Sequence, residues 1–206
     1  MTHFTVAIIV PPHINDIGDY IDGQMQPFDE STAVKPYVCY SIEQAAIELA
    51  ETIHRFELIV SRNERLHDIE RCKQHLDQLK RTTPEEQYQD RLRYYETVNK
   101  LGEPLSTVNP NSKWDWYVIG GRWDGWIHDH KCEGEGIANN IASTEHVIVA
   151  GKIPHAIITP DGRWHEHGRM GWFATLLTEN EGWNEHARGL FAAHPGTRVV
   201  IVDAHI

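Results

Sequence analysis

The sequence predicts an α+β fold, in which a mixed or antiparallel sheet carries a long helical hairpin inserted after the first strand. Two apolar, β-branched runs near the chain ends, Phe4–Val10 and Val199–Asp203, are typical of buried strands. Residues 41–101 show helical periodicity and separate the first strand from the others. Short strand-like runs and one helix then alternate over residues 114–203. We expect a single α+β domain over residues 1–206 with 41–101 as a helical insertion, and a ferredoxin-like sheet is one arrangement that fits.

Length, charge and cysteine usage narrow the class of protein. The chain has 206 residues, with 19 Lys+Arg against 30 Asp+Glu and a formal net charge of -11. This acidity disfavours an extended nucleic-acid footprint or an anionic membrane surface, because like charges repel. No segment approaches the roughly 18 apolar residues that a membrane span needs. The 3 cysteines are scattered, which favours a reduced, cytoplasmic protein without a membrane partner.

The first half of the chain is expected to be a loop followed by helices. Residues 11–40 are rich in Pro, Asp and Gly and indicate an irregular segment. A capping box beginning at Ser41 predicts a helix start, and a second box beginning at Thr83 precedes Pro84, which suits the first helical position. We interpret residues 62–101 as a charged antiparallel helical hairpin. It is either a solvated insertion or a surface for a partner or a second copy in a homodimer.

The second half is expected to be mainly strands. The pair Gly120-Gly121 permits a turn or bulge, and the run Pro160-Asp161-Gly162 indicates a tight hairpin turn. The expected elements are strands at Trp114–Ile119, Arg122–Ile127, Glu145–Ala150, His155–Thr159 and Arg163–His165, a loop at 131–143, and a helix at Trp183–Ala193.

The densest group of chemistry-bearing residues lies between Asn109 and Trp123. Alternate residues of a strand share a face, so Lys113, Asp115 and Tyr117 are expected on one face, with Trp114 and Trp116 on the other. A cation, a carboxylate and a phenol would then meet. The alternative is a Trp-packed sheet with an internal ion pair.

Arg122 adds a guanidinium fork for phosphate or carboxylate, and tryptophan rings can stack on bases or sugars. The short run Gly162-Arg163-Trp164 resembles Gly121-Arg122-Trp123. The candidate ligand-binding residues are Lys113, Trp114, Asp115, Trp116, Tyr117, Arg122, Trp123, Arg163 and Trp164.

Histidines supply the candidate catalytic groups. His165 and His167 share a face of an extended strand and could hold a metal with a third ligand. Asp203 and His205 end the last strand, where the aspartate could orient the histidine as a general base. We therefore expect His165, Asp203 and His205 as catalytic candidates, His165, His167 and His205 as metal candidates, and a divalent metal as a candidate cofactor. The alternatives are a polar hairpin edge and a solvated C-terminal tail.

Three pieces of the chain resemble small proteins of uncharacterised function encoded in bacteriophage and prophage genomes. The Lys113–Trp123 run is the most specific of them, and the helical region is not part of the likeness. The resemblance implies a protein made in the cytoplasm of a bacterial host cell, as a host-takeover or counter-defence factor. The pieces are His3–Val6 with Gln26–Glu30, the run Asn109–Trp123, and the ending Pro160–His165, Met170–Trp172 and Val202–Ile206.

Two functional hypotheses follow. The leading one is a pocket of Trp, Arg and His that binds a nucleotide-like or other phosphate-bearing ligand, with phosphoester hydrolysis as its reaction. The rival is a non-catalytic, acidic protein that binds and inhibits a host protein. Residues 1–60 hold nine acidic and two basic side chains, which would suit such a role.

Overall fold

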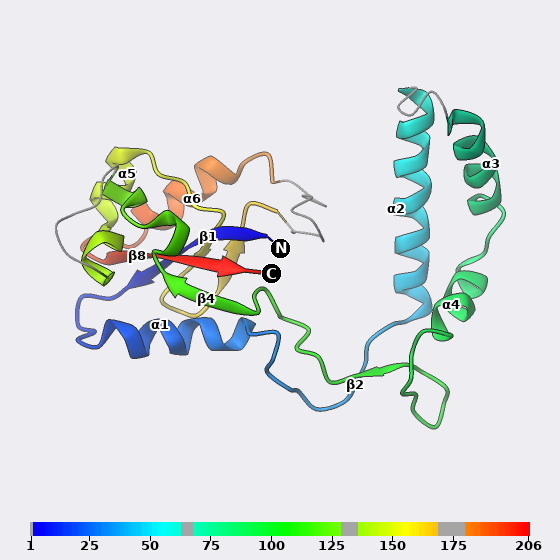
Figure 1. The fold of residues 1–206 in the computed structure, drawn as a ribbon, viewed down its shortest axis with the longest axis horizontal. Coiled ribbons are helices and arrows are strands. Elements are labelled where there is room, and N and C mark those ends of the chain that lie inside the picture. The colour runs from blue at the N-terminus through cyan, green and yellow to red at the C-terminus, as the bar shows by residue number, and fades with distance from the viewer. Residues whose placement is uncertain (1, 63–67, 129–135, 169–179) are drawn as a thin grey trace. The chain divides into compact units, whose positions relative to one another are not determined.

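The computed structural model describes residues 2–62, 68–128, 136–168 and 180–206. The chain divides into two compact units. The sheet unit consists of residues 1–33 and 108–206, and the helical unit consists of residues 34–107. Helices and a mixed sheet occur together, which confirms the α+β class (Figure 1).

Within the described residues of the sheet unit, six strands form one sheet in the order β4-β8-β1-β6-β7, with β5 also paired to β8. Strands β1 and β6 run parallel, and the other pairs are antiparallel. The sheet is therefore mixed, while the ferredoxin-like arrangement stays a prediction. The strands are β1 (His3–Val10), β4 (Trp116–Ile119), β5 (Ile141–Ser143), β6 (Ala156–Ile158), β7 (Trp164–Glu166) and β8 (Arg198–His205).

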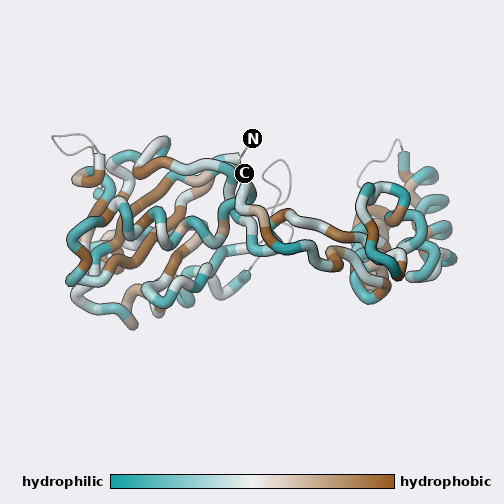
Figure 2. The backbone as a smooth tube through the Cα atoms, turned by 90° about the horizontal axis from the view of Figure 1, so that it is seen from below, coloured by the Kyte–Doolittle hydropathy of each residue, from teal (hydrophilic) through white to brown (hydrophobic). Residues whose placement is uncertain are grey.

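Both faces of the central strands β1 and β8 are buried, which explains their continuous apolar sequences. One face packs Val6 and Ile8 against helix α1 (Ile17–Met25). The opposite face packs Ile9 and Ile201 against helices α5 (Thr144–Ala150) and α6 (Trp183–Ala192). Figure 2 shows these strands as brown, hydrophobic segments. The core therefore consists of two layers, one on each side of the sheet.

Helix α1 lies in the segment expected to be a loop, so that expectation was wrong for residues 17–25. The Asp16 carboxylate caps the helix by accepting the Asp19 N–H at 3.0 Å. Ile17, Ile21 and Met25 recur every four residues and face the sheet. The short 3-10 turn η1 (Gln26–Phe28) follows, as Pro27 ends the helix.

Two expected strands are also absent from the described residues. Residues 144–150 form helix α5, because the Ser143 hydroxyl accepts the His146 N–H at 3.1 Å and starts a helix. In place of a strand at 122–127 there are the 3-10 turns η3 (Gly121–Trp123) and η4 (Trp126–His128). The expected loop contains the turn η5 (Gly136–Asn140) and β5, while residues 131–135 lie outside the described residues.

The helical unit contains α2 (Ile42–Ser61), α3 (Ile69–Leu79), α4 (Pro84–Leu92) and the two-stranded pair β2 (Tyr37–Val38) and β3 (Leu105–Ser106). Both predicted capping boxes are present, at Ser41 and Thr83. Helices α3 and α4 both pack against α2. Since α4 ends at Leu92, the expected helix up to residue 101 was too long. None of the described helices is long and apolar enough to cross a membrane.

Candidate functional site

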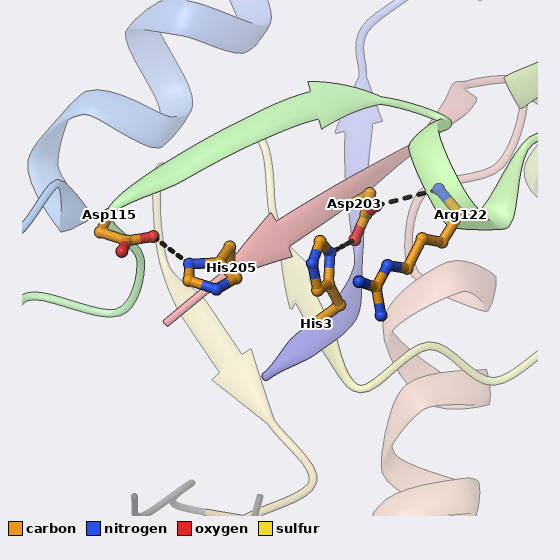
Figure 3. A network of polar contacts seen from close by, with 5 residues as sticks. All are labelled: His3, Asp115, Arg122, Asp203 and His205. Carbon is orange, nitrogen blue, oxygen red and sulfur yellow. Dashed lines mark hydrogen bonds and ion pairs between the residues drawn. The ribbon is translucent and has the colours of Figure 1, made fainter. Parts of the chain in front are cut away.

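Three strand segments bring four chemistry-bearing residues to one end of the sheet. In the antiparallel pair β1–β8, His3 lies opposite His205 and Thr5 opposite Asp203. On the other side of β8, Trp116 lies opposite His205. Because directly opposite residues share a face of a sheet, His3, Trp116, Asp203 and His205 all lie on the same face. Their strands are separated in sequence, but the register places the side chains together (Figure 3).

Two histidines in this cluster are each held by a carboxylate. His3 Nδ1 lies 2.9 Å from Asp203 Oδ1, and His205 Nδ1 lies 2.6 Å from Asp115 Oδ1. The side chains of His3, His205 and Asp203 are only 10%, 6% and 2% exposed. A carboxylate accepts, so each imidazole donates through Nδ1, and its Nε2 is left to meet a ligand.

The Nε2 atoms of the two histidines, His3 and His205, make no hydrogen bond within the part of the chain that the structure describes. Neither atom belongs to the fully enclosed polar atoms that lack a partner, so both retain contact with solvent. Each ring is therefore fixed at Nδ1, whereas its Nε2 has no hydrogen-bond partner among the described residues and keeps some contact with solvent, as proton transfer to a ligand requires.

The rings of the cluster are in mutual contact. The centroids of His3 and His205 are 5.0 Å apart, with an interplanar angle of 72°. Trp116 stacks on His205 at 5.2 Å and 17°, and it makes a T-shaped contact with His3 at 5.1 Å and 79°. Trp116 nevertheless stays 43% exposed. An aromatic surface thus borders the histidine pair and is accessible to a ligand.

The glycine pair after β4 closes the site over Asp203. Gly120 and Gly121 have φ values of 76° and 53°, in the left-handed region. A Cβ on Gly121 would lie 2.5 Å from Asp203 Oδ2, so no larger residue fits without a shift. This close approach lets the backbone N–H of Arg122 donate to Asp203 Oδ2 at 2.9 Å. Figure 3 shows the Arg122 side chain extending beside the His3 ring.

The sequence led us to expect that Asp203 orients His205, and this expectation was wrong. Asp203 pairs with His3, and Asp115 pairs with His205. Asp203 and His205 do share a face of β8, but residues two apart in a strand point the same way and seldom meet each other. The partner of each histidine therefore comes from another segment.

The expected meeting of Lys113, Asp115 and Tyr117 on one face was wrong, because β4 begins only at Trp116. Lys113 Nζ lies 2.9 Å from Glu166 Oε1. The Tyr117 hydroxyl donates to Asp22, and burial together with this carboxylate holds the pKa of Tyr117 well above its ordinary range.

The remaining ligand-binding candidates lie in the core or in a turn. Trp114 is buried and donates its Nε1–H to the Met25 carbonyl at 3.1 Å. Trp123 packs in the core beside α6, and Trp164 packs on the other face. The Arg163 guanidinium pairs with Asp161 at 3.1 Å in an exposed turn.

His165 and His167 do not join His205. Strand β7 is three strands away from β8, or about 14 Å at a spacing of about 4.8 Å. His165 Nδ1 instead lies 3.3 Å from His186 Nε2, and His167 stacks on Trp183. Within the described ranges, no set of three His, Cys, Asp or Glu side chains is placed to hold a metal ion. The metal candidates are therefore not brought together.

His155, beside β6, makes stability depend on pH. Burial lowers its pKa below the ordinary 6.5, and its charged neighbours are Glu166, His167 and Lys113. A depressed histidine pKa means that the unfolded chain binds protons first, so stability is complete above pH of about 6.5 and falls as the pH drops below it. We expect the melting temperature to fall between pH 7.5 and pH 5.5, and to fall less in His155→Gln.

The exposed His13 provides the control for this prediction. His13→Gln should follow the same pH dependence as the parent in a thermal melt monitored by circular dichroism. An equal fall for His155→Gln and the parent would show that His155 does not carry the effect.

The sequence did not identify His3 as a site residue. Its partner Asp203 is 200 positions away in the chain, and only the β1–β8 register brings them together. The one available signal was that each terminal strand carries a histidine at its outer end.

Protein-family models, curated proteins and solved structures give no match to this chain. The chemistry of the site therefore rests on the contacts of the described residues, and the resemblance to phage proteins stays a prediction.

Proposed function

We propose that the protein binds a nucleotide-like, phosphate-bearing ligand at the His3–His205 site and cleaves a phosphoester bond in it. The observation that carries the proposal is a pair of imidazoles whose ring centroids are 5.0 Å apart, each fixed by a carboxylate and each with an Nε2 that has no partner among the described residues and keeps some contact with solvent. Such a pair supplies both a proton acceptor and a proton donor to one reacting group.

The carboxylates give the two imidazoles their roles. A hydrogen bond from Nδ1–H to a carboxylate fixes the tautomer, leaves the Nε2 lone pair free in the neutral ring, and stabilises the imidazolium when that ring is protonated. In the proposed reaction, one ring accepts a proton as the base and the other donates a proton as the acid. Asp203 and Asp115 are then positioning residues.

Arg122 and Trp116 supply binding energy. The Arg122 side chain is exposed and extends beside His3, where a guanidinium can bind phosphate with two parallel hydrogen bonds. The two other candidate cations already have carboxylate partners, since Lys113 pairs with Glu166 and Arg163 with Asp161. The exposed ring of Trp116 can stack on a base. These contacts favour a nucleotide over inorganic phosphate.

The acidic-interaction hypothesis is less well supported. Two of the aspartates in its acidic segment have structural tasks, since Asp16 caps α1 and Asp22 accepts the hydroxyl of Tyr117. Their reversal to lysine would damage the fold and could not report on a partner.

In the bacterial cytoplasm to which the phage resemblance points, cleavage of a nucleotide would serve host takeover or counter-defence.

Calorimetric titration tests the binding part of the proposal. We expect adenosine 3′-monophosphate to bind at least about tenfold more tightly than adenosine, because the phosphate contacts Arg122 and the histidine pair. Arg122→Gln should weaken the nucleotide about tenfold, whereas Arg163→Gln, in an exposed turn, should bind as the parent does. No heat with adenosine, guanosine, cytidine or uridine monophosphates would overturn the proposed function.

A further inference from the structure

Within the described residues, the groups that contact the histidine pair include no hydroxyl or thiol, and the proposed function already assigns both imidazoles to proton transfer. In this described part of the chain, the side chains that hydrogen-bond to the two imidazoles or make ring contacts with them are Asp115, Asp203 and Trp116, and the two imidazoles also contact each other. Two carboxylates committed to Nδ1–H groups and an indole cannot form a covalent phosphoryl intermediate. The hydroxyl of Thr5, which lies opposite Asp203 in the sheet, is buried and accepts the His155 N–H at 2.9 Å. The nucleophile is then either water or a hydroxyl group of the substrate itself.

A ribose 2′-hydroxyl next to a 3′-phosphodiester meets this need. It is held beside the phosphorus by the substrate itself, so the attack gains the rate advantage of an intramolecular reaction. It also needs one base and one acid within hydrogen-bond reach, and two open Nε2 atoms provide them. A 2′-deoxy sugar has no such group.

Trp116 indicates where the base lies. Its ring is 43% exposed and stacks one face on His205, so a base can stack on the opposite face and extend its sugar past the edge of the indole toward the imidazole pair. The net charge of -11 opposes binding of a chain with many phosphates. The charge and the aromatic platform together favour a substrate with one or a few phosphates.

We infer that the substrate is a short ribonucleotide with a 3′,5′-phosphodiester bond, cleaved by its own 2′-hydroxyl; this inference rests on the proposed function. One imidazole Nε2 takes the proton of the 2′-hydroxyl as the bond from O2′ to phosphorus forms. The bond from phosphorus to O5′ breaks, and O5′ receives the proton from the other Nε2. The products are a 2′,3′-cyclic phosphate and a free 5′-hydroxyl, and no oxidant or reductant is consumed.

The test uses the full chain with adenylyl-3′,5′-adenosine and with its analogue that lacks the first 2′-hydroxyl. We expect the ribonucleotide to give adenosine 2′,3′-cyclic phosphate and adenosine in equal amounts by chromatography. The deoxy analogue should bind within about threefold of the same affinity and stay intact. Trp116→Ala should weaken both ligands about tenfold or more, whereas Val118→Ala, at the next exposed position on the same face of β4, should not.

The outcomes separate the inference from the proposed function. Equal cleavage of both dinucleotides, or binding of both without cleavage of either, would overturn the 2′-hydroxyl mechanism while nucleotide binding stands. If neither dinucleotide binds and no monophosphate binds, both the 2′-hydroxyl mechanism and the proposed function would be overturned. The His205→Gln protein, purified in the same way, should show no cleavage, which guards against a contaminating nuclease.

Discussion

Exchanging His205 for glutamine is expected to lower the turnover of a ribodinucleotide by about 10²- to 10⁴-fold, the usual contribution of a general acid or base. His3→Gln should lower it by a similar factor, because each ring supplies one of the two proton transfers. Glutamine keeps a polar group beside Asp115 or Asp203 but cannot shuttle a proton. The measurement is kcat by chromatography, with circular dichroism to verify that each variant is folded.

The shape of the pH–rate profile distinguishes proton transfer from a structural effect. The parent should give a bell-shaped profile, and each single variant should lose one limb of it. The double variant should be little slower than either single variant, since the two rings act as a unit. His13→Gln should keep the activity of the parent. Unchanged turnover in a folded His205→Gln protein would contradict the assignment.

Gly121→Ala should cost about 3 kcal/mol in the free energy of unfolding and also disable the site. An added Cβ would lie 2.5 Å from Asp203 Oδ2 and 2.6 Å from Asp203 Cβ. Overlap of this kind in a packed region costs about 1–3 kcal/mol, and left-handed backbone adds about 1–2 kcal/mol for a residue with a side chain. Asp203 must then move away from His3 and from the Arg122 N–H. Chemical denaturation gives the stability, and the dinucleotide assay gives the activity.

Gly196 provides a matched control, since it has a φ of 71° and a Cβ there would meet nothing within 4 Å. Gly196→Ala should therefore show only the backbone cost of about 1–2 kcal/mol and retain activity. Equal losses for the two variants would show that contact with Asp203 is not what requires glycine at position 121.

The parts of the fold that sequence could predict are those with strong local patterns. Strands β1 and β8 are long apolar runs, and the helix starts after Ser41 and Thr83 carry both halves of a capping box. Helix α1 was missed because its nine residues include two glycines and because prolines occur in the segment that precedes it. Helix α5 was mistaken for a strand because Val147, Ile148 and Val149 are β-branched.

Part of the candidate site was predictable for the same reason. Asp115, Trp116, Arg122, Asp203 and His205 lie at the ends of recognisable strands or at a glycine pair, and the structure brings them together. Which aspartate hydrogen-bonds to which histidine was not predictable, because the register of the sheet decides which side chains from different segments lie next to each other.

His3 and His165 illustrate the two kinds of error that sequence patterns produce, a site residue that is missed and a residue that is wrongly assigned to the site. His3 was not predicted to belong to the site, whereas the register places it next to Asp203. His165 was grouped with His205, whereas the strand order separates them by β1 and β6. Sequence patterns identify which residues are polar at strand ends, but strand order decides which of them meet.

The central claim is that a phosphate-bearing ligand meets the Nε2 atoms of His3 and His205. The most direct test is to titrate the full chain with adenosine 3′-monophosphate and follow the histidine ring signals by NMR, assigned with the His3→Gln and His205→Gln variants. We expect the His3 and His205 signals to shift together along one saturation curve, while those of His13 and His186 stay in place. A saturable shift confined to other histidines, or no shift for these two at saturating ligand, would contradict the claim.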